Sequence, residues 1–155
     1  MFRKAQAKDM EAIMRLLLQV NNVHAEGRPD LFIKDVRKYT REKVAEIISD
    51  PTTPVFVSTD EEDRTVGYCF CRIIDHSHDH HLQPVKTLYI DDLCVDAAMR
   101  GKHIGSDLYR NVREWAKENS FYNITLNVWA CNPGAMRFYQ SLGLQPQKTT
   151  LEFRI

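Results

Sequence analysis

The stretch Arg100-Gly101-Lys102-His103-Ile104-Gly105-Ser106 joins two segments of different periodicity. Residues 87–95 before it form a strand-like apolar run, and residues 104–119 after it carry apolar side chains at helical spacing. A short glycine-containing turn between a strand and a helix directs several free backbone N–H groups at one point, and the helix dipole adds positive potential there. Because Gly101 and Gly105 lack a Cβ, an anion can approach the backbone closely. The stretch predicts a phosphate or pyrophosphate site, and an ordinary glycine-containing loop is the alternative.

The elements expected around this turn give an α/β (α+β) fold. Capping and spacing signals predict four helices, at residues 9–20 with Asp9 as N-cap, 40–50 with Thr40 as N-cap, 104–119 and 133–142, with a loop or broken helix at 21–34. Strands are expected at residues 2–6, 54–59, 65–74, 85–95, 123–130 and 148–153. Consecutive strands imply antiparallel hairpins, whereas the strand–helix–strand unit over residues 85–130 implies one parallel crossover. We therefore expect a mixed, mostly antiparallel sheet of six to seven strands flanked by about four helices.

Length and composition favour a single domain over residues 1–155. The chain is 43% hydrophobic and 27% charged, which is ordinary for a globular protein of this size. Its 21 basic and 21 acidic side chains give a net charge of zero, which argues against a nucleic-acid partner. The first residues lack a signal-peptide pattern, and no apolar run approaches membrane-spanning length. We expect a cytoplasmic protein without a membrane partner.

Three motifs carry a family resemblance, and the third follows the other two by one crossover strand. Leu93-Cys94-Val95 is followed by Arg100-x-x-His103-x-Gly105 and then by Asn132-x-x-Ala135-x-x-Phe138-Tyr139-x-x-x-Gly143. The pattern resembles the GNAT superfamily of acetyl-CoA-dependent N-acetyltransferases, closely over residues 88–145 and in element order over residues 2–74. His103 stands where that family has the middle glycine of the turn. Since histidine adopts left-handed backbone angles more readily than most residues, the turn is expected to survive.

The resemblance implies acetyl-CoA as the acetyl donor. The turn would bind the pyrophosphate through backbone N–H groups and the Ser106 hydroxyl, and the main chain of Leu93 and Val95 would contact the pantetheine arm, because the family's strand splays from its neighbour there. Asn132 would contact the same arm, and it is also suited to cap the helix that Pro133 begins. The expected cofactor-binding residues are Leu93, Cys94, Val95, Arg100, Gly101, Lys102, His103, Ile104, Gly105, Ser106, Asn132 and Tyr139.

The expected catalytic residues are Tyr139, Asp91 and Asp92. Tyr139 matches the family tyrosine that protonates the leaving thiolate, a role that suits a phenol because its pKa is close to that of a thiol; a core tyrosine is the alternative. The acceptor amine must lose a proton before it attacks, so a strand carboxylate can serve as general base. Asp91 ranks first as general base, because the polyamine-acetylating branch of the family keeps a glutamate at this position. Tyr89 lies on the same face of the strand as Asp91 and could line the same cleft. Neighbouring strand residues face opposite sides unless a bulge intervenes, and structural carboxylates are the alternative for the pair.

The expected function is N-acetyl transfer to a primary amine of a small molecule or peptide, by direct attack in a ternary complex. Backbone N–H groups near residues 93–95 would stabilise the oxyanion, and Cys94 lacks the histidine partner that a nucleophile needs. One alternative is a non-catalytic coenzyme A-binding sensor, which His103 favours. The other is a nucleotide-binding module, which the missing Lys-Ser/Thr and GxGxxG patterns disfavour. Homodimers are common in the family, so a homodimer is one expectation.

The remaining polar clusters are assigned to loops and core. Cys69 and Cys71 are two residues apart in a strand-like run, so they should share a face as small buried side chains. The histidines at 76, 78, 80 and 81 lack accompanying ligands at structural-site spacing, so no metal is expected, and a hairpin loop near the acceptor mouth is predicted instead. The loop after the first helix supplies candidate acceptor-site residues: His24, Arg28, Asp30 and Phe32.

Overall fold

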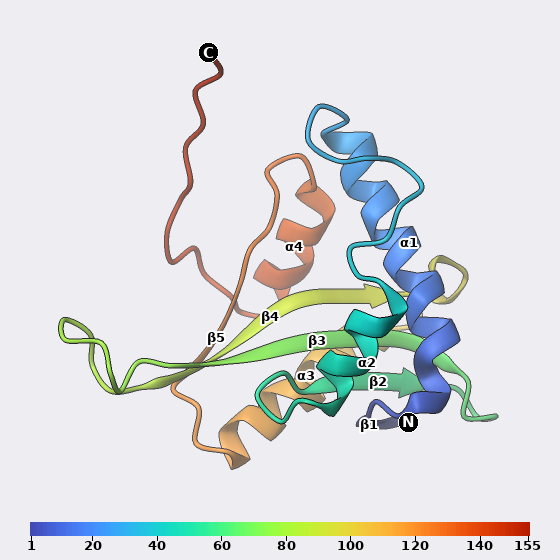
Figure 1. Ribbon diagram of the computed structural model, residues 1–155, viewed down its shortest axis with the longest axis horizontal. Coiled ribbons are helices and arrows are strands. Elements are labelled where there is room, and N and C mark those ends of the chain that lie inside the picture. The colour runs from blue at the N-terminus through green and yellow to red at the C-terminus, as the bar shows by residue number, and fades with distance from the viewer.

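The sheet has five strands, arranged in the order β1-β2-β3-β4-β5 in a computed structural model that describes residues 1–155 (Figure 1). The strands are β1 (Phe2–Lys4), β2 (Val55–Thr59), β3 (Thr65–Asp75), β4 (Lys86–Val95) and β5 (Asn123–Leu126). The first four pair antiparallel, and β5 pairs with β4 in parallel. The expected mixed sheet and its parallel crossover are confirmed, although the strand number is five rather than six to seven.

Four helices flank the sheet, as expected. They are α1 (Met10–Gly27), α2 (Arg41–Ser49), α3 (Ile104–Glu118) and α4 (Pro133–Ser141), with short 3-10 turns η1 (Ala7–Asp9) and η2 (Ala97–Met99). Figure 1 shows α1 and α2 in front of the sheet and α3 behind it. No helix combines the length and the apolar character needed to cross a membrane.

Each face of the sheet carries its own hydrophobic core because successive strand residues point to opposite faces. On the α1/α2 face the fully buried side chains are Ile13, Leu16, Leu17, Val44, Val57 and Tyr68. On the α3 face they are Leu88, Leu108, Val112 and Cys69, with Phe56 almost as deep. Cys69 and Cys71 lie on this second face with their Sγ atoms 3.6 Å apart, which confirms that they share a side.

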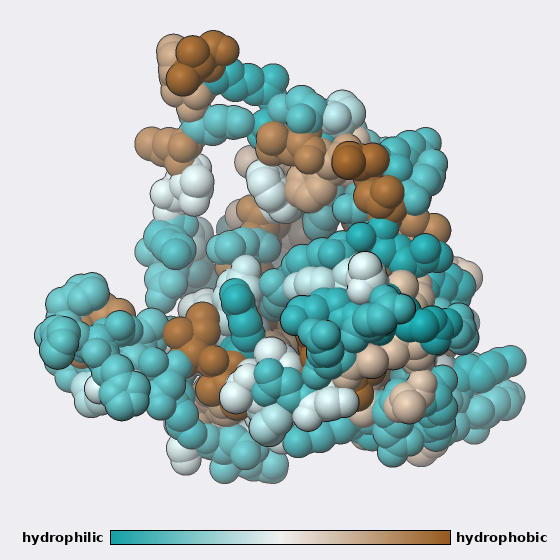
Figure 2. All heavy atoms as spheres, viewed as in Figure 1, coloured by the Kyte–Doolittle hydropathy of each residue, from teal (hydrophilic) through white to brown (hydrophobic).

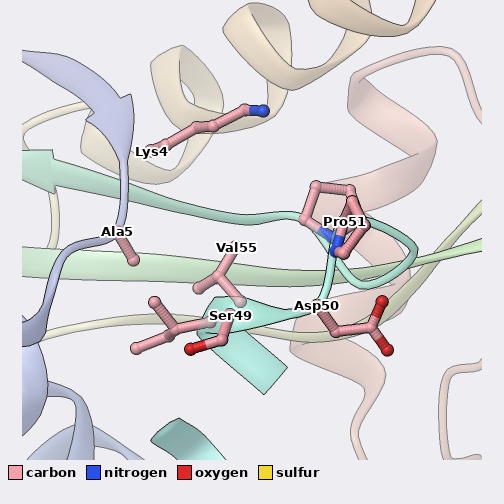
Figure 3. A pocket seen from close by; sticks show the side chains of 8 residues that line it. Lys4, Ala5, Ser49, Asp50, Pro51 and Val55 are labelled. Carbon is pink, nitrogen blue, oxygen red and sulfur yellow. The ribbon is translucent and has the colours of Figure 1, made fainter. Parts of the chain in front are cut away.

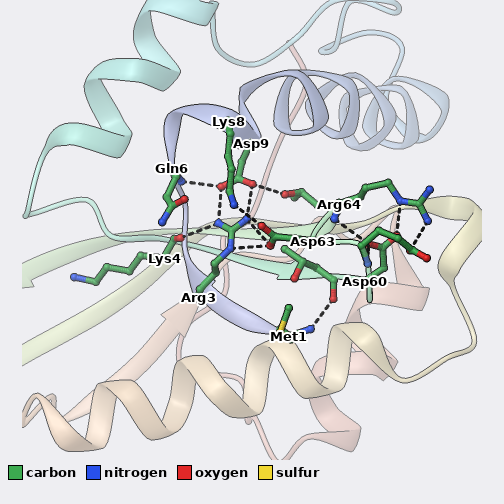
Figure 4. Close-up of polar contacts among 12 residues, drawn as sticks. Met1, Arg3, Lys4, Gln6, Lys8, Asp9, Asp60, Asp63 and Arg64 are labelled. Carbon is green, nitrogen blue, oxygen red and sulfur yellow. Dashed lines mark hydrogen bonds and ion pairs between the residues drawn. The ribbon is translucent and has the colours of Figure 1, made fainter.

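The beginning of α1 differs from the expected N-cap. Asp9 lies inside η1 and makes no side-chain cap bond to α1. Its carboxylate accepts hydrogen bonds at 2.7 and 2.9 Å from the Arg3 guanidinium, at 2.7 Å from the Thr65 hydroxyl and at 2.7 Å from the Gln6 backbone N–H (Figure 4). The N-cap position of Asp9 is confirmed, but its side chain does not cap α1, because the Arg3 guanidinium of β1 binds the carboxylate more strongly than a backbone amide would.

The predicted N-cap of α2 is confirmed, whereas the predicted end of α1 is not. The Thr40 cap is confirmed, since its side chain accepts from the Lys43 backbone N–H at 3.2 Å. The loop expected from residue 21 begins only after Gly27, because α1 continues for two more turns. Asn21 fits inside this helix because its amide donates to the Ile33 carbonyl at 2.8 Å and so gains a partner in the chain that folds back over it.

The last expected strand does not form. Residues 145–155 run away from the body of the molecule and are all exposed (Figure 1). None of them takes part in a backbone hydrogen bond. Strand structure requires a partner, and β5 ends at Leu126 rather than at residue 130, with no neighbour on its outer edge. Residues 148–153 therefore remain a tail, which accounts for the lower strand number.

Candidate active site

β4 loses its β5 partner halfway along its length. The parallel pairing covers Thr87 to Ile90, opposite residues 123–126, whereas pairing with β3 continues to Val95. The backbone edge of residues 91–95 on the β5 side therefore has no strand partner. This is the divergence that the family resemblance implied for Leu93 and Val95.

A β-bulge at the point of divergence brings two carboxylates to one face. Phe70 is opposite Asp92 and Cys71 is opposite Ile90, so Asp91 is an extra residue in β4. Asp91 Oδ2 accepts from Lys38 Nζ at 2.7 Å and from the Tyr39 hydroxyl at 2.5 Å. Asp92 Oδ2 accepts from the Tyr68 hydroxyl at 2.8 Å on the same α1/α2 face. The condition that a bulge could place both aspartates together is thus met.

The two carboxylates differ in basicity. Burial raises the pKa of Asp92 to about 6, more than the hydrogen bond from Tyr68 lowers it. Burial also acts to raise the pKa of Asp91, but the hydrogen bonds from Lys38 and Tyr39 outweigh it and leave that pKa below its ordinary value. Of the pair, Asp92 is the stronger proton acceptor near neutral pH, whereas the Asp91 carboxylate forms an ion pair with Lys38.

The turn between β4 and α3 presents a row of free donors. The backbone N–H groups of residues 101–106 find no acceptor within the protein; the next one, from Asp107, bonds to the His103 carbonyl at 3.0 Å. Gly101 and His103 adopt left-handed backbone angles, with φ of 78° and 60°. The expected left-handed histidine is confirmed, and the turn keeps its shape without the family's middle glycine.

The two glycines of the turn, Gly101 and Gly105, have different structural roles. A Cβ at Gly101 would meet nothing within 4 Å, so the backbone there is open to a ligand. A Cβ at Gly105 would lie 3.4 Å from the Phe138 ring and 3.5 Å from a Val95 methyl group. Gly105 therefore lets the start of α3 pack closely on α4 and β4.

Helix α4 supplies Asn132 and Tyr139. Asn132 accepts from the Ala135 backbone N–H at 3.1 Å, which confirms its capping role before Pro133. The Tyr139 ring meets Tyr109 edge-on with centroids 6.4 Å apart. Its hydroxyl takes part in no hydrogen bond within the protein, and burial, Cys69 and the charge of Asp92 raise its pKa well above the ordinary value. Tyr139 is thus a protonated phenol with a free donor.

A pocket lies beside Asp91 on the α1/α2 face. It has a volume of about 340 Å3, and its lining includes Tyr39 in the loop before α2, Glu46 of α2, Phe70 and Arg72 of β3, and Asp91 of β4. Tyr89 also faces this side, where its ring lies under Arg72 with the guanidinium 5.1 Å from the centroid. The smaller pocket in Figure 3, between Lys4 and Pro51, contains none of the candidate residues.

The loop after α1 is brought near the chain that follows β5. His24 and Phe32 have ring centroids 5.1 Å apart, and Phe32 meets Trp129 edge-on, also at 5.1 Å. Burial and the charge of Lys38 lower the pKa of His24. Arg28 is engaged elsewhere, with Asp30 and Glu152, so the structure separates it from the aromatic group.

Sequence reasoning missed Lys38, Tyr39, Tyr68 and Trp129. Trp129 gave no usable signal because it lies within the strand expected at residues 123–130, and its 42% exposure is seen only in the structure. Lys38 and Tyr39 lie in an aperiodic loop, and Tyr68 reads as an ordinary core residue.

The other chemically notable residues stay outside the site. Burial raises the pKa of Cys94 to about 12, so its thiol is a poor nucleophile. The histidines at 76–81 lie in the β3–β4 hairpin, at the opposite end of β4 from the glycine turn (Figure 1). No group of three or more His, Cys, Asp or Glu side chains is arranged to hold a metal ion.

Comparisons with known proteins agree with this geometry. The family model described as the acetyltransferase (GNAT) family matches residues 10–144, and no curated protein matches the chain. A mutant of the BH1408 protein from Bacillus halodurans is 30% identical, with a TM-score of 0.94 over 100% of this chain and 99% of that one. An aminoglycoside acetyltransferase from an uncultured soil metagenomic sample, in complex with sisomicin, is 17% identical, with a TM-score of 0.72 over 100% and 94% of the two chains. The aminoglycoside N-acetyltransferase AAC(6')-Iy, in complex with CoA, is 12% identical, with a TM-score of 0.73 over 100% and 98%.

The family model covers most of the chain, residues 10–144, and this range includes the divergence of β4 from β5 and the glycine turn. The chain belongs to the acetyltransferase (GNAT) family.

Proposed function

We propose that the protein transfers an acetyl group from acetyl-CoA to a primary amine of a small molecule or peptide, by direct attack in a ternary complex. The observation that carries the proposal is the open edge of β4, from which the chain continues into a row of free backbone donors at residues 101–106. The hydroxyl of Tyr139 on α4 is likewise free. A non-catalytic coenzyme A sensor would need the backbone donors of residues 101–106 but not the Tyr139 phenol.

The residues present suit acetyl-CoA, the donor that the family uses. Free N–H groups at a helix start match the two charges of a pyrophosphate, and the unpaired edge of residues 91–95 offers donors and acceptors to the amide groups of a pantetheine arm. Acetyl-CoA supplies the thioester. The protein contributes position and proton transfer.

We assign the general base to Asp92 rather than Asp91, which reverses the order expected from the family's glutamate. With a pKa of about 6, Asp92 is mostly ionised at neutral pH and still basic enough to accept a proton from an ammonium group. Asp91 is held by Lys38 and Tyr39 and is better suited to position the acceptor side. Two carboxylates on this face favour a cationic amine over a neutral or anionic acceptor.

Tyr139 is assigned as the general acid. Its raised pKa keeps the phenol protonated until the thiolate leaves, and its hydroxyl has no competing partner in the protein. Replacing Tyr139 by phenylalanine removes only the oxygen, so the fold and the affinity for acetyl-CoA should persist while turnover falls by about 10²- to 10⁴-fold.

The test measures acetyl transfer to a panel of polyamines, aminoglycosides, amino acids and peptides by wild type and Tyr139→Phe. Tyr122→Phe is the matched control, because Tyr122 is 74% exposed and outside the site. Thermal unfolding with CoA, ATP and NAD is measured in parallel. Stabilisation by CoA without turnover on any amine would favour the sensor, and stabilisation by ATP or NAD but not by CoA would overturn the proposal.

A further inference from the structure

Arg72 of β3 is a cation without a counter-ion. Its guanidinium lies over the Tyr89 ring, 5.1 Å from the centroid, and the Asn127 side-chain amide donates to the Tyr89 hydroxyl at 3.1 Å. The Arg72 side chain takes part in no ion pair and in no hydrogen bond within the protein. Because a guanidinium that lies over a ring keeps the N–H groups at its edge free, Arg72 presents a positioned charge and unused donors.

The other charged side chains that line the pocket beside Asp91 already have partners. Each of them makes a contact of 2.7 or 2.8 Å within the chain. The pairs are Lys43 with Glu46, Asp91 with Lys38, and Asp50 with Thr52. Arg72 is therefore the one charge of this pocket that the protein leaves uncompensated, and a ligand that displaces its water has to supply the counter-ion.

The part of the sheet face that carries Arg72 has no helix over it. Figure 1 shows α1 and α2 in front of the half of the sheet near the C-terminal end of β4, whereas the half toward the β3–β4 hairpin is bare. Figure 2 shows hydrophobic and hydrophilic atoms side by side in this region, to the left of α2. Ile74 is half-buried and lies on the same face as Arg72, two residues further along β3. The surface thus offers apolar contact to a carbon chain and a charge to one end of it.

The position of Arg72 separates it from the expected pyrophosphate site. Arg72 is opposite Tyr89, which precedes Val95 by six residues, so roughly 20 Å of strand separates it from the turn with the donors at residues 101–106. Asp92, the proposed general base, follows Tyr89 by only three residues, or roughly 10 Å. Arg72 is therefore placed to contact the acceptor and not the acetyl donor.

We propose that the acceptor carries a carboxylate as well as its amine, and that Arg72 binds this carboxylate. The inference rests on the proposed function, because it concerns the acceptor of that reaction. A span of roughly 10 Å from Arg72 to Asp92 requires several carbons between the two groups, as in the side chains of free lysine or ornithine. An α-amine is too close to its carboxylate to reach both ends. Asp91, which lies between them, repels a doubly charged phosphate more than a carboxylate, and a diamino acid keeps the net positive charge that the two aspartates favour.

The transfer step is that of the proposed function. The side-chain amine forms an N–C bond with the acetyl carbon as the C–S bond of the thioester breaks. The amine proton passes to Asp92, and the departing thiolate takes a proton from Tyr139. The carboxylate at Arg72 does not react, and it is bound equally before and during the transfer. Arg72 is thus a specificity-determining residue whose effect should be mainly on KM.

The experiment compares acceptors that differ only in the carboxylate. Lysine is paired with cadaverine and ornithine with putrescine, because each diamine is the decarboxylated form of the amino acid. Wild type, Arg72→Gln and Arg72→Lys are measured at saturating acetyl-CoA, and mass spectrometry locates the acetyl group on the product. Arg64→Gln is the matched control, because Arg64 lies between β2 and β3 with 72% of its side chain exposed, outside the pocket. Thermal unfolding confirms that each variant is folded.

Wild type and Arg64→Gln should prefer lysine to cadaverine by at least about tenfold in kcat/KM, with the acetyl group on the side-chain nitrogen. Arg72→Gln should lower this preference at least about tenfold, mainly through the KM for lysine. Arg72→Lys should restore part of it, since it keeps the charge but not the planar donors. Equal kcat/KM for lysine and cadaverine in wild type, or an unchanged preference in Arg72→Gln, would overturn the inference and leave the proposed function standing. Absence of turnover on every amine would overturn both.

Discussion

Replacing Asp92 by asparagine should raise stability while it abolishes acetyl transfer. Burial raises the pKa of Asp92 from its ordinary value of 3.8 to about 6, a difference of about 2.2 units. At about 1.36 kcal/mol per unit, keeping this carboxylate ionised costs the folded state up to about 3 kcal/mol above pH 6. Asparagine has the same shape, carries no charge and can still accept from Tyr68. The substitution should therefore increase the free energy of unfolding by up to about 3 kcal/mol at pH 7.5.

The size of this effect depends on pH. Below about pH 3.8 the carboxyl is protonated in both the folded and the unfolded state, so the gain should vanish there. Asp91→Asn is the matched control with the opposite sign, because the pKa of Asp91 is lowered and its charge is stabilising at pH 7.5. Urea unfolding at pH 7.5, 5 and 3.5 measures all three proteins.

Activity supplies the second half of the same test. In wild type, kcat/KM should rise with pH through an apparent pKa near 6, where Asp92 ionises. Asp92→Asn should lose this rise and about 10²- to 10⁴-fold of the rate. A variant that is less stable than wild type at pH 7.5, or one that keeps its turnover, would refute the assignment of Asp92 as a buried general base.

Four further predictions concern the fold and the turn. Asp9→Asn should lower the free energy of unfolding by about 2.5 kcal/mol at pH 7. Burial acts to raise the pKa of Asp9, but its hydrogen bonds, first of all from Arg3, outweigh burial and lower the pKa from 3.8 to about 2. Urea titrations should show the difference between the variant and wild type disappearing as pH falls from about 4 to 2. Asp63→Asn, at a 38% exposed partner of the same arginine, should cost clearly less than Asp9→Asn in the same titration, because solvent screens an exposed ion pair. His103→Gly should raise the melting temperature by a few degrees, since it relieves a left-handed backbone worth about 1–2 kcal/mol, and calorimetry should find the Kd for acetyl-CoA changed by less than about tenfold. Gly101→Ala should lower the melting temperature by a similar amount, because its φ is 78°.

The parts of the fold that the sequence predicts are those whose causes are local. The Thr40 and Asn132 caps each bond to a backbone N–H three residues away, so the signal and the bond lie in one turn of chain. The left-handed conformation of His103 likewise follows from a short turn between two elements. The parallel crossover followed from the order of strand and helix patterns.

The parts that failed depend on distant segments. Asp9 has the residue type and the position of an N-cap, yet its carboxylate accepts hydrogen bonds from Arg3 of β1 and Thr65 of β3 instead of from the helix. Residues 148–153 have strand periodicity, but periodicity does not state which edge a strand joins, and no edge of the sheet receives them. The ion pair between Asp91 and Lys38 likewise has no local signal, because the loop that carries Lys38 has no periodicity to place it.

The bulge at Asp91 does have a signature in the sequence, and it explains why the site carries a cost. Leu88 and Ile90 point to the α3 face, and simple alternation would send residue 92 there next; instead Leu93 packs on that face. The change of parity between residues 90 and 93 requires one extra residue, and that residue turns Asp92 away from the α3 core toward Tyr68. Without the shift, the carboxylate of Asp92 would enter an apolar core with no donor. With it, the charge is buried but hydrogen-bonded beside the open edge of β4, where a raised pKa would suit the proton transfer that we propose. The instability expected at Asp92 and its suitability as a base are therefore two consequences of the same inserted residue.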